Sequence, residues 1–324
     1  MIFALPLSAE FSHVYLHELD QREQQGEVIW TQPITEPFDE LILCWNGDRP
    51  KEGRIAFFAS VQQDETWSPW LYYAEWGSYG QMLFQDDLPT SIAYSSRGKL
   101  CPKKGHCTAF RIQAIASGGA SMESIRNFTV STSDDKQCKA ALHPARELES
   151  HLLPSVARQS QITLRHPRYQ DLSMPTSACI ALNTIFGQRL IDPSQFARQV
   201  LDENFDDYES WALNCAQIAY HLGDEHLVQI VRCVDFTPIY NALKQGYPSL
   251  IAIRGSVQNG PRPFYSEHTI CIVGYDSAQQ AVLCIDPAFP NDSATFASYP
   301  LQSLLSAWFK RGNRACIISR RFQR

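Results

Sequence analysis

The sequence predicts two domains, an N-terminal antiparallel β-sandwich and a C-terminal α+β domain, and three observations lead to this interpretation. The chain has 324 residues, which is more than one hydrophobic core usually serves. Between residues 28 and 132, apolar and polar residues alternate in short runs, as in strands with one buried face. After residue 159, runs with helical spacing come first and strand-like runs follow, which is the order of an α+β domain.

The alternating runs define the first domain, which we expect to cover residues 1–134. The clearest runs are RIAFFASV from Arg54, CTAFRIQAIA from Cys107 and RNFTVST from Arg126, and Gly, Asn, Asp and Pro residues separate them. Such a series of short strands and turns is typical of a sandwich. Residues 135–158 are charged and contain two X-Pro steps, so they predict a linker between the domains.

The second domain, expected at residues 159–324, has well-marked helix boundaries. Helices are predicted near Pro175 with Gly187 as the stop, after Asp192, after Thr237, and at residues 211–222. The stripes of apolar residues on these helices predict core packing. Strands are predicted at 249–254, 268–275, 281–286 and 315–320, and the turn between the second and third of them predicts a hairpin.

Composition and charge exclude several classes of protein. Hydrophobic residues make up 44% of the chain and charged residues 19%, which is the balance of a folded protein. A formal net charge of -6 without runs of Lys or Arg gives no surface for phosphate backbones, so we expect no nucleic-acid partner. No apolar stretch reaches the roughly 18 residues of a membrane span. The start, MIFALPLSAEF, lacks the basic region of a signal peptide, so we expect a cytoplasmic protein, or one exported without a Sec signal peptide.

The ten cysteines are scattered, and most lie in apolar runs, which predicts buried free thiols. Cys101 and Cys107, on either side of His106, have the only spacing that suggests a metal site or a disulfide. A tetrahedral zinc site needs four ligands, and no matching second pair is present. A hairpin loop is therefore favoured at these residues, and we expect no metal and no cofactor.

Three polar residues stand at the ends of predicted elements in the second domain. Ser173 opens a helix, His268 begins a strand, and Asp286 ends the next strand just before Pro287. In nucleophilic catalysis, a base activates a hydroxyl or thiol while a third group orients the base. Taken singly, each residue has an ordinary structural explanation, because Ser173 would cap a helix, His268 would sit at a strand end and Asp286 would form a turn.

These residues lie in motifs that resemble the peptidase C39-like family, papain-fold relatives of the peptidases that process bacteriocin leaders. In that family Cys-Ser-Pro-Thr-Ser opens the central helix, Gly-His begins a strand ending in Gly-Tyr-Asp, and Asn-Asp-Pro-Ala closes the hairpin. The resemblance implies a papain-like cysteine peptidase fold and a peptide or protein ligand. It also implies that Ser173 holds the nucleophile position, that His268 is the base, that Asp286 orients it, and that Gln170 is an oxyanion donor. The similar residues here are 173–177, 267–268, 274–276, 285–288, Tyr299 and Trp308.

The first domain resembles a β-sandwich module that is often fused ahead of this peptidase domain, through residues 44–46, 67–70 and 110–111. Its tryptophans have two interpretations. Trp67, Trp70 and Trp76 would either form a platform for sugars or peptides or pack in and around the sheets. Packing is favoured, because aromatic side chains dominate sheet cores.

Departures from the family pattern leave three interpretations of activity. A thiol with a pKa near 8.5 can rest as a thiolate beside a histidine, whereas a serine cannot rest as an alkoxide. Only two residues separate Gln170 from Ser173, where relatives have a longer loop, and Glu267 adds a negative charge beside His268. The favoured interpretation is a degenerate or weakly active peptidase that binds a peptide-like ligand. The others are an active hydrolase of peptide or isopeptide bonds that uses Ser173, His268 and Asp286, and a cysteine enzyme silenced by an engineered serine.

Overall fold

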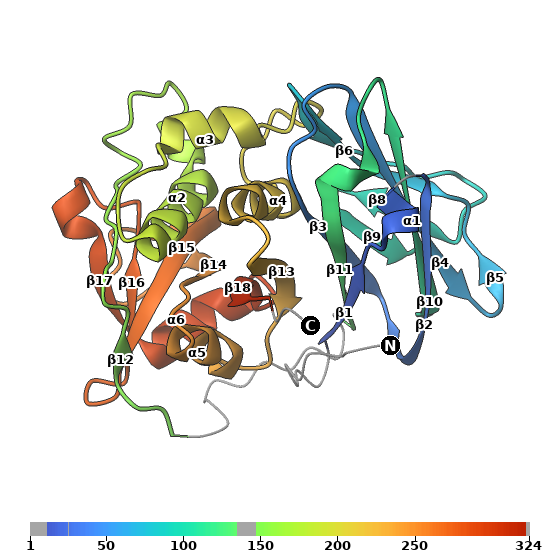
Figure 1. Ribbon diagram of the computed structural model, residues 1–324. Coiled ribbons are helices and arrows are strands. Elements are labelled where there is room, and N and C mark those ends of the chain that lie inside the picture. The colour runs from blue at the N-terminus through green and yellow to red at the C-terminus, as the bar shows by residue number, and fades with distance from the viewer. Residues whose placement is uncertain (1–11, 25, 135–146, 322–324) are drawn as a thin grey trace. The chain divides into compact units, whose positions relative to one another are not determined.

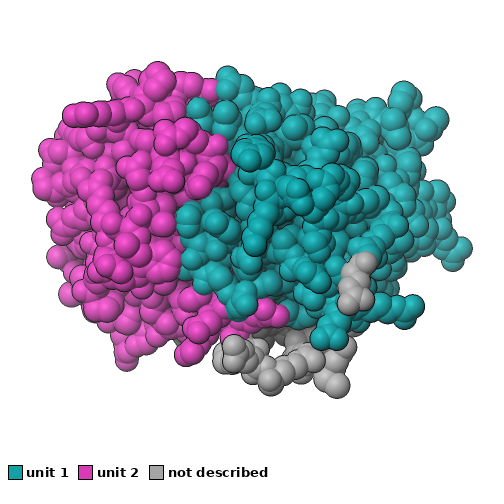
Figure 2. All heavy atoms as spheres, turned by 45° about the horizontal axis from the view of Figure 1, so that its top comes forward, with its two compact units in different colours: residues 1–138, 201–224 teal, residues 139–200, 225–324 magenta. Residues whose placement is uncertain are grey.

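The computed structural model describes residues 12–24, 26–134 and 147–321. The chain divides into two compact units, shown in Figure 2. Unit 1 holds residues 1–138 and 201–224, and unit 2 holds residues 139–200 and 225–324. Antiparallel strands dominate both units. No helix in the described part of the chain is long and apolar enough to cross a membrane.

Unit 1 contains two antiparallel sheets, as the alternating runs predict. The first sheet has five strands in the order β1 (Ser12–Glu18), β11 (Ile125–Ser133), β3 (Glu40–Gly47), β9 (Lys99–Pro102) and β8 (Ala93–Ser96). The second has the order β2 (Val28–Phe38), β10 (Cys107–Ser117), β4 (Arg54–Gln63), β6 (Leu71–Gly77) and β7 (Gln81–Leu83), and β5 (Thr66–Trp67) pairs with β4. Two short helices, α1 (Gln21–Gln24) and the 3₁₀ turn η1 (Met122–Ser124), complete the N-terminal part.

Aromatic side chains from both sheets share one core. The Trp45 ring from β3 stacks on Phe57 from β4 at 4.3 Å between centroids, and Trp76 from β6 meets the Trp45 ring edge-on at 5.5 Å. Trp76 is therefore a core residue, as the packing interpretation expects. Trp67 and Trp70 are half-buried instead, and the Arg111 guanidinium lies over both of their rings.

A segment from the middle of the chain belongs to the core of unit 1. Helix α4 (Trp211–Leu222) begins after Ser210, whose side chain accepts a hydrogen bond from the Leu213 N–H, and ends at Gly223, whose φ is 68°. Its Ala212, Leu213 and Ala216 pack in the same apolar cluster as the aromatic core. The sequence predicts this helix correctly but assigns it to the second domain.

Unit 2 is built on an antiparallel sheet (Figure 1). The strand order is β13 (His226–Arg232), β18 (Arg314–Arg320), β14 (Ser249–Gly255), β15 (Phe264–Asp276), β16 (Ala281–Ile285) and β17 (Phe296–Pro300). The predicted hairpin is present, since Asp276 pairs with Ala281. The helices are α2 (Ser173–Phe186), α3 (Pro193–Val200), α5 (Thr237–Lys244) and α6 (Leu301–Phe309), with 3₁₀ turns η2 (Tyr169–Asp171) and η3 (Asp292–Thr295).

Two connecting segments differ from what the sequence predicts. Residues 135–146 of the expected linker lie outside the described residues, but β12 (His151–Leu152) pairs with β15, so part of the expected linker belongs to the sheet of unit 2. The loop from Cys101 to Cys107 is not a hairpin. Strand β9 pairs with β3 and β8, whereas β10 pairs with β2 and β4, so this loop crosses from one sheet to the other.

Candidate active site

Helix α2 brings Ser173 next to strand β15. The N-cap of the helix is Leu172, so Ser173 occupies the first turn and does not cap the helix. Its Oγ accepts a hydrogen bond from the Thr269 N–H at 3.1 Å, and the Ser177 hydroxyl donates to the Thr269 carbonyl at 2.9 Å. These two bonds fix the start of α2 at the residue that follows His268.

His268 lies in β15 opposite Ile253 of β14. Its Nε2 is 2.7 Å from Oδ1 of Asp286, and its ring stacks on Phe264 at 3.9 Å between centroids with an interplanar angle of 11°. An ionised Asp286 accepts the Nε2 proton, which leaves the lone pair of the neutral imidazole on Nδ1. The carboxylate and the stacked ring thus fix both the tautomer and the orientation of the imidazole.

Asp286 follows β16 and is fully buried. Besides His268, it accepts a hydrogen bond from the Tyr299 hydroxyl at 2.6 Å and one from the Ala288 N–H at 2.9 Å. Burial raises the pKa of the Asp286 carboxyl, but the charge and hydrogen bond of His268 and the bonds from Tyr299 and Ala288 outweigh it, so the pKa lies below its ordinary value. Burial, followed by the charge of Asp286, raises the pKa of Tyr299. Asp286 is therefore an anion held by three donors, and Tyr299 is a neutral donor.

Gln170 lies in η2 and is exposed, and its amide donates to the Tyr169 hydroxyl at 3.3 Å. A second glutamine, which the sequence analysis did not single out, occupies the buried part of the same loop. Gln161 is 1% exposed, donates through its side chain to the carbonyls of Tyr169 and Gln170, and bonds through its backbone N–H to the Pro287 carbonyl at 2.9 Å. Gln161 therefore ties the turn before α2 to the turn after Asp286. Its position in a polar loop gave no periodic signal by which to find it.

Glu267 is paired with a cation. Its carboxylate forms an ion pair with the Arg311 guanidinium, and both side chains are largely shielded from solvent. Its negative charge beside His268, which the sequence analysis noted, is thus opposed by Arg311.

A hollow of about 450 Å³, open to solvent, lies elsewhere in unit 2. It is lined by residues 155–159 and, in and just after the second half of α2, by Ile180, Asn183 and residues 187–189, whereas Ser173 begins that helix. Even the nearest of these α2 residues, Ile180, is seven residues along the helix from Ser173, which corresponds to about 10 Å. Ser173 and His268 are themselves 2% and 4% exposed. The hollow is therefore not part of the candidate site, which is largely covered.

The structure thus brings Ser173, His268 and Asp286 into one region of unit 2 and leaves Gln170 on the surface beside it. The sequence model of the peptidase C39-like family matches residues 154–316, which is half of the chain. This range includes Ser173, His268 and Asp286. No curated protein matches the chain in sequence. The extent of the family match shows that the chain belongs to the peptidase C39-like family.

Proposed function

We propose that unit 2 forms the papain-like domain of a degenerate or weakly active peptidase, which binds a peptide or protein segment at Ser173 and His268. Family membership supports a peptidase-related function. The observation that carries the proposal is the buried pair of His268 and Asp286 beside a serine hydroxyl, because this pair is the base and orienting group of a peptidase without the sulfur.

Two physical arguments favour weak or absent turnover. A cysteine thiolate can be formed before attack, whereas a serine must lose its proton during attack, which demands a base and a geometry tuned for oxygen. The exposed fractions of Ser173 and His268, 2% and 4%, also restrict the approach of a scissile peptide bond.

A working hydrolase of peptide or isopeptide bonds is the second candidate, and one observation favours it. Tyr299, Asp286 and His268 form an unbroken chain of hydrogen bonds with separations of 2.6 and 2.7 Å. In this candidate His268 takes the Ser173 proton through Nδ1, and Asp286 stabilises the imidazolium that forms. A backbone N–H would donate to the oxyanion, and Gln170 would do so only after its exposed amide leaves the Tyr169 hydroxyl and turns toward Ser173.

Thiol labelling of three proteins tests whether a catalytic pair is assembled: the wild type, Ser173→Cys, and Ser173→Cys combined with His268→Ala. The thiol introduced by Ser173→Cys should react with iodoacetamide faster than the native thiols, and His268→Ala should remove that advantage. The native background is low, because burial raises the pKa of Cys101 to about 11 and that of Cys107 to about 12. Cys138 lies outside the described residues, so the rate at which its thiol is labelled is measured in the wild type by peptide mapping.

Cleavage of a peptide library by the same proteins and by Ser173→Ala separates the two candidates. The degenerate peptidase should bind peptides without cleaving them efficiently. Cleavage by the wild type that disappears in Ser173→Ala would overturn the first proposal and establish a serine hydrolase. Equal labelling with and without His268 would contradict both candidates.

A further inference from the structure

One arginine of unit 1 lies against two tryptophans without an acidic partner. The guanidinium carbon of Arg111 is 4.7 Å from the ring centroid of Trp67 and 4.4 Å from that of Trp70. Its Nε is shielded from solvent and has no hydrogen-bond partner. Burial alone lowers the pKa of this guanidinium, and no carboxylate of the described residues offsets the loss of water. The cluster therefore holds a partly desolvated positive charge that no described residue balances.

The register of the second sheet explains why these side chains meet. Arg111 lies on β10 between Phe110 and Ile112, which point into the core, so its own side chain points away from the core. It pairs with Ser60 of β4, whose hydroxyl donates to the Ser68 carbonyl at 2.7 Å. The small Ser60 side chain lets the guanidinium lie across β4 and reach the indole rings on either side of Ser68 in the sequence.

The open polar groups of this cluster are hydrogen-bond donors. The two Nη atoms of Arg111 are not among the shielded atoms that lack a partner, and no described acceptor bonds to them, so both are open to solvent. The indole N–H groups of Trp67 and Trp70 are open in the same way. The Nη groups of a guanidinium form a flat fork that matches the two oxygens of a carboxylate. The cluster therefore suits a carboxylate, and a neutral ligand would leave its charge unbalanced.

A row of apolar side chains runs beside the cluster on the same face of the sheet. Two residues along β10 from Arg111, Gln113 pairs with Ile29 of β2 and with Phe58 of β4. Phe58 stacks on Tyr72 of β6 at 4.6 Å between centroids, and Ile29 is 56% exposed. Residues two apart on one face of a strand are about 7 Å apart. An extended peptide can therefore contact the guanidinium and the apolar row with side chains two positions apart.

Two carboxylates border the apolar row, and both are engaged. Glu75 accepts a hydrogen bond from the Tyr72 hydroxyl and pairs with Arg54 at 3.1 Å. Asp86 accepts a hydrogen bond from the Tyr72 N–H at 3.0 Å. Neither carboxylate affects the pKa of Arg111, so neither serves as its counter-charge.

We infer that this outer face of unit 1 binds an extended peptide that carries an aspartate or a glutamate. The carboxylate pairs with the Nη groups of Arg111 against the rings of Trp67 and Trp70. An apolar side chain two positions away packs on Ile29 and Phe58. The choice of a peptide rests on the proposed function, whereas the carboxylate follows from the cluster itself.

Fluorescence anisotropy with two labelled peptides tests this inference. Fluorescein-Gly-Phe-Gly-Glu-Gly-amide and the same peptide with glutamine in place of glutamate are titrated with the full chain carrying Ser173→Ala, which prevents cleavage at Ser173. An ionic strength of about 150 mM screens weak attraction between exposed charges. The glutamate peptide should bind at least tenfold more tightly than the glutamine peptide, and Arg111→Gln should remove this difference. The matched control is Arg97→Gln, because Arg97 lies over one ring of the same unit, Phe205, at 4.8 Å; it should keep the tenfold preference.

Two further measurements keep the inference testable if Arg111→Gln fails to fold. Arg111→Glu should prefer a lysine peptide to the glutamate peptide, which loss of folding would not produce. In wild-type protein with ¹⁵N-labelled arginine, the glutamate peptide should shift the Arg111 Nε–H resonance and the glutamine peptide should not. Tetragalacturonate, which carries carboxylates on a sugar, should bind at least tenfold more weakly than the glutamate peptide.

Three results would overturn the inference: equal affinities of the two peptides, an unchanged Arg111 resonance, or tighter binding of tetragalacturonate than of the glutamate peptide. Labelling of the thiol in Ser173→Cys does not involve Arg111. The inference can therefore fail while the proposed function of unit 2 stands, and the reverse.

Discussion

Replacing Tyr299 by phenylalanine tests whether Asp286 depends on the donors that surround it. Tyr299→Phe removes the hydroxyl that donates to Oδ2 of Asp286 at 2.6 Å and keeps the buried ring. The change therefore separates the hydrogen bond from the packing of β17.

The expected cost follows from the burial and the charge of Asp286. A hydrogen bond to a charged group contributes about 1.5–3 kcal/mol, and the upper half of that range applies where no water can replace the lost donor. We expect the free energy of unfolding of unit 2 to fall by about 2–3 kcal/mol at pH 7. Loss of the donor also removes one of the interactions that lower the pKa of Asp286, so that pKa rises.

Hydrogen exchange measured by mass spectrometry gives this cost for unit 2 alone. The slowest amides of β16 and β17 should exchange roughly 30 to 160 times faster in Tyr299→Phe. Tyr265→Phe is the matched control, because Tyr265 is 87% exposed in β15 of the same sheet, and it should change the free energy by less than about 0.5 kcal/mol. If both variants exchange alike, the phenol does not hold Asp286 and the hydrogen-bond chain to His268 is wrong.

Three further predictions concern packing and pH. Leu213→Ala should lower the free energy of unfolding of unit 1 by about 2–5 kcal/mol, measured as faster hydrogen exchange of the β3 amides. Leu190 is 58% exposed in unit 2, so the control Leu190→Ala should lower the free energy of unfolding of unit 2 by less than about 0.5 kcal/mol. Trp76→Ala should cost about 3–5 kcal/mol in urea unfolding, and Trp70→Ala clearly less, because Trp70 is half-buried. Asp286 has a lowered pKa when folded, so its contribution to stability is present above about pH 4 and is lost as the pH falls through that lower value. The stability difference between the wild type and Asp286→Asn should therefore shrink in acid, and an unchanged difference would contradict the lowered pKa.

Local features of the sequence predict the elements well, because turn residues and periodicity act over a few residues. Gly187 and Gly223 end their helices as predicted, and the strands at 268–275 and 281–286 form the predicted hairpin. Local features do not predict which core a buried helix face packs against. Every residue from 211 to 219 is buried, but an apolar helix face specifies burial and not the core that it joins, so the packing of α4 in unit 1 could not be predicted.

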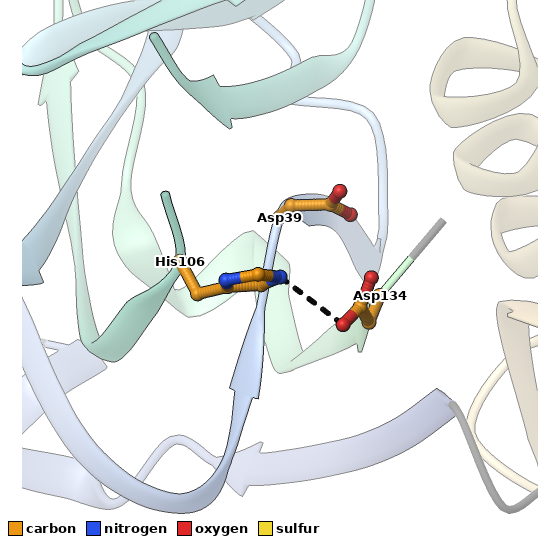
Figure 3. A group of neighbouring side chains, drawn as sticks. All are labelled: Asp39, His106 and Asp134. Atoms are coloured by element: carbon orange, nitrogen blue, oxygen red, sulfur yellow. Dashed lines mark ion pairs between the residues drawn. The ribbon is translucent and has the colours of Figure 1, made fainter. Parts of the chain in front are cut away.

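The candidate site shows the same division. His268 and Asp286 flank the hairpin, so their meeting follows from local pairing, whereas the approach of Ser173 to Thr269 depends on how α2 packs on the sheet. The neighbouring side chains of Asp39, His106 and Asp134 (Figure 3) are the hardest to predict from local sequence. His106 drew attention through the cysteines near it, but its neighbours are Asp39 and Asp134, which only the registers of two sheets bring together.

The buried pair of His268 and Asp286 has a structural role that does not depend on catalysis. A buried carboxylate is costly unless donors surround it, and the donors to Asp286 come from β15, from β17 and from the turn after β16. Removing any one of them would leave a buried charge less compensated, so the pair stabilises the fold in an active peptidase and in an inactive one alike. Its presence therefore does not require turnover. The chemistry depends on the atom at position 173, which makes Ser173→Cys, measured with His268 present and then removed, the decisive comparison.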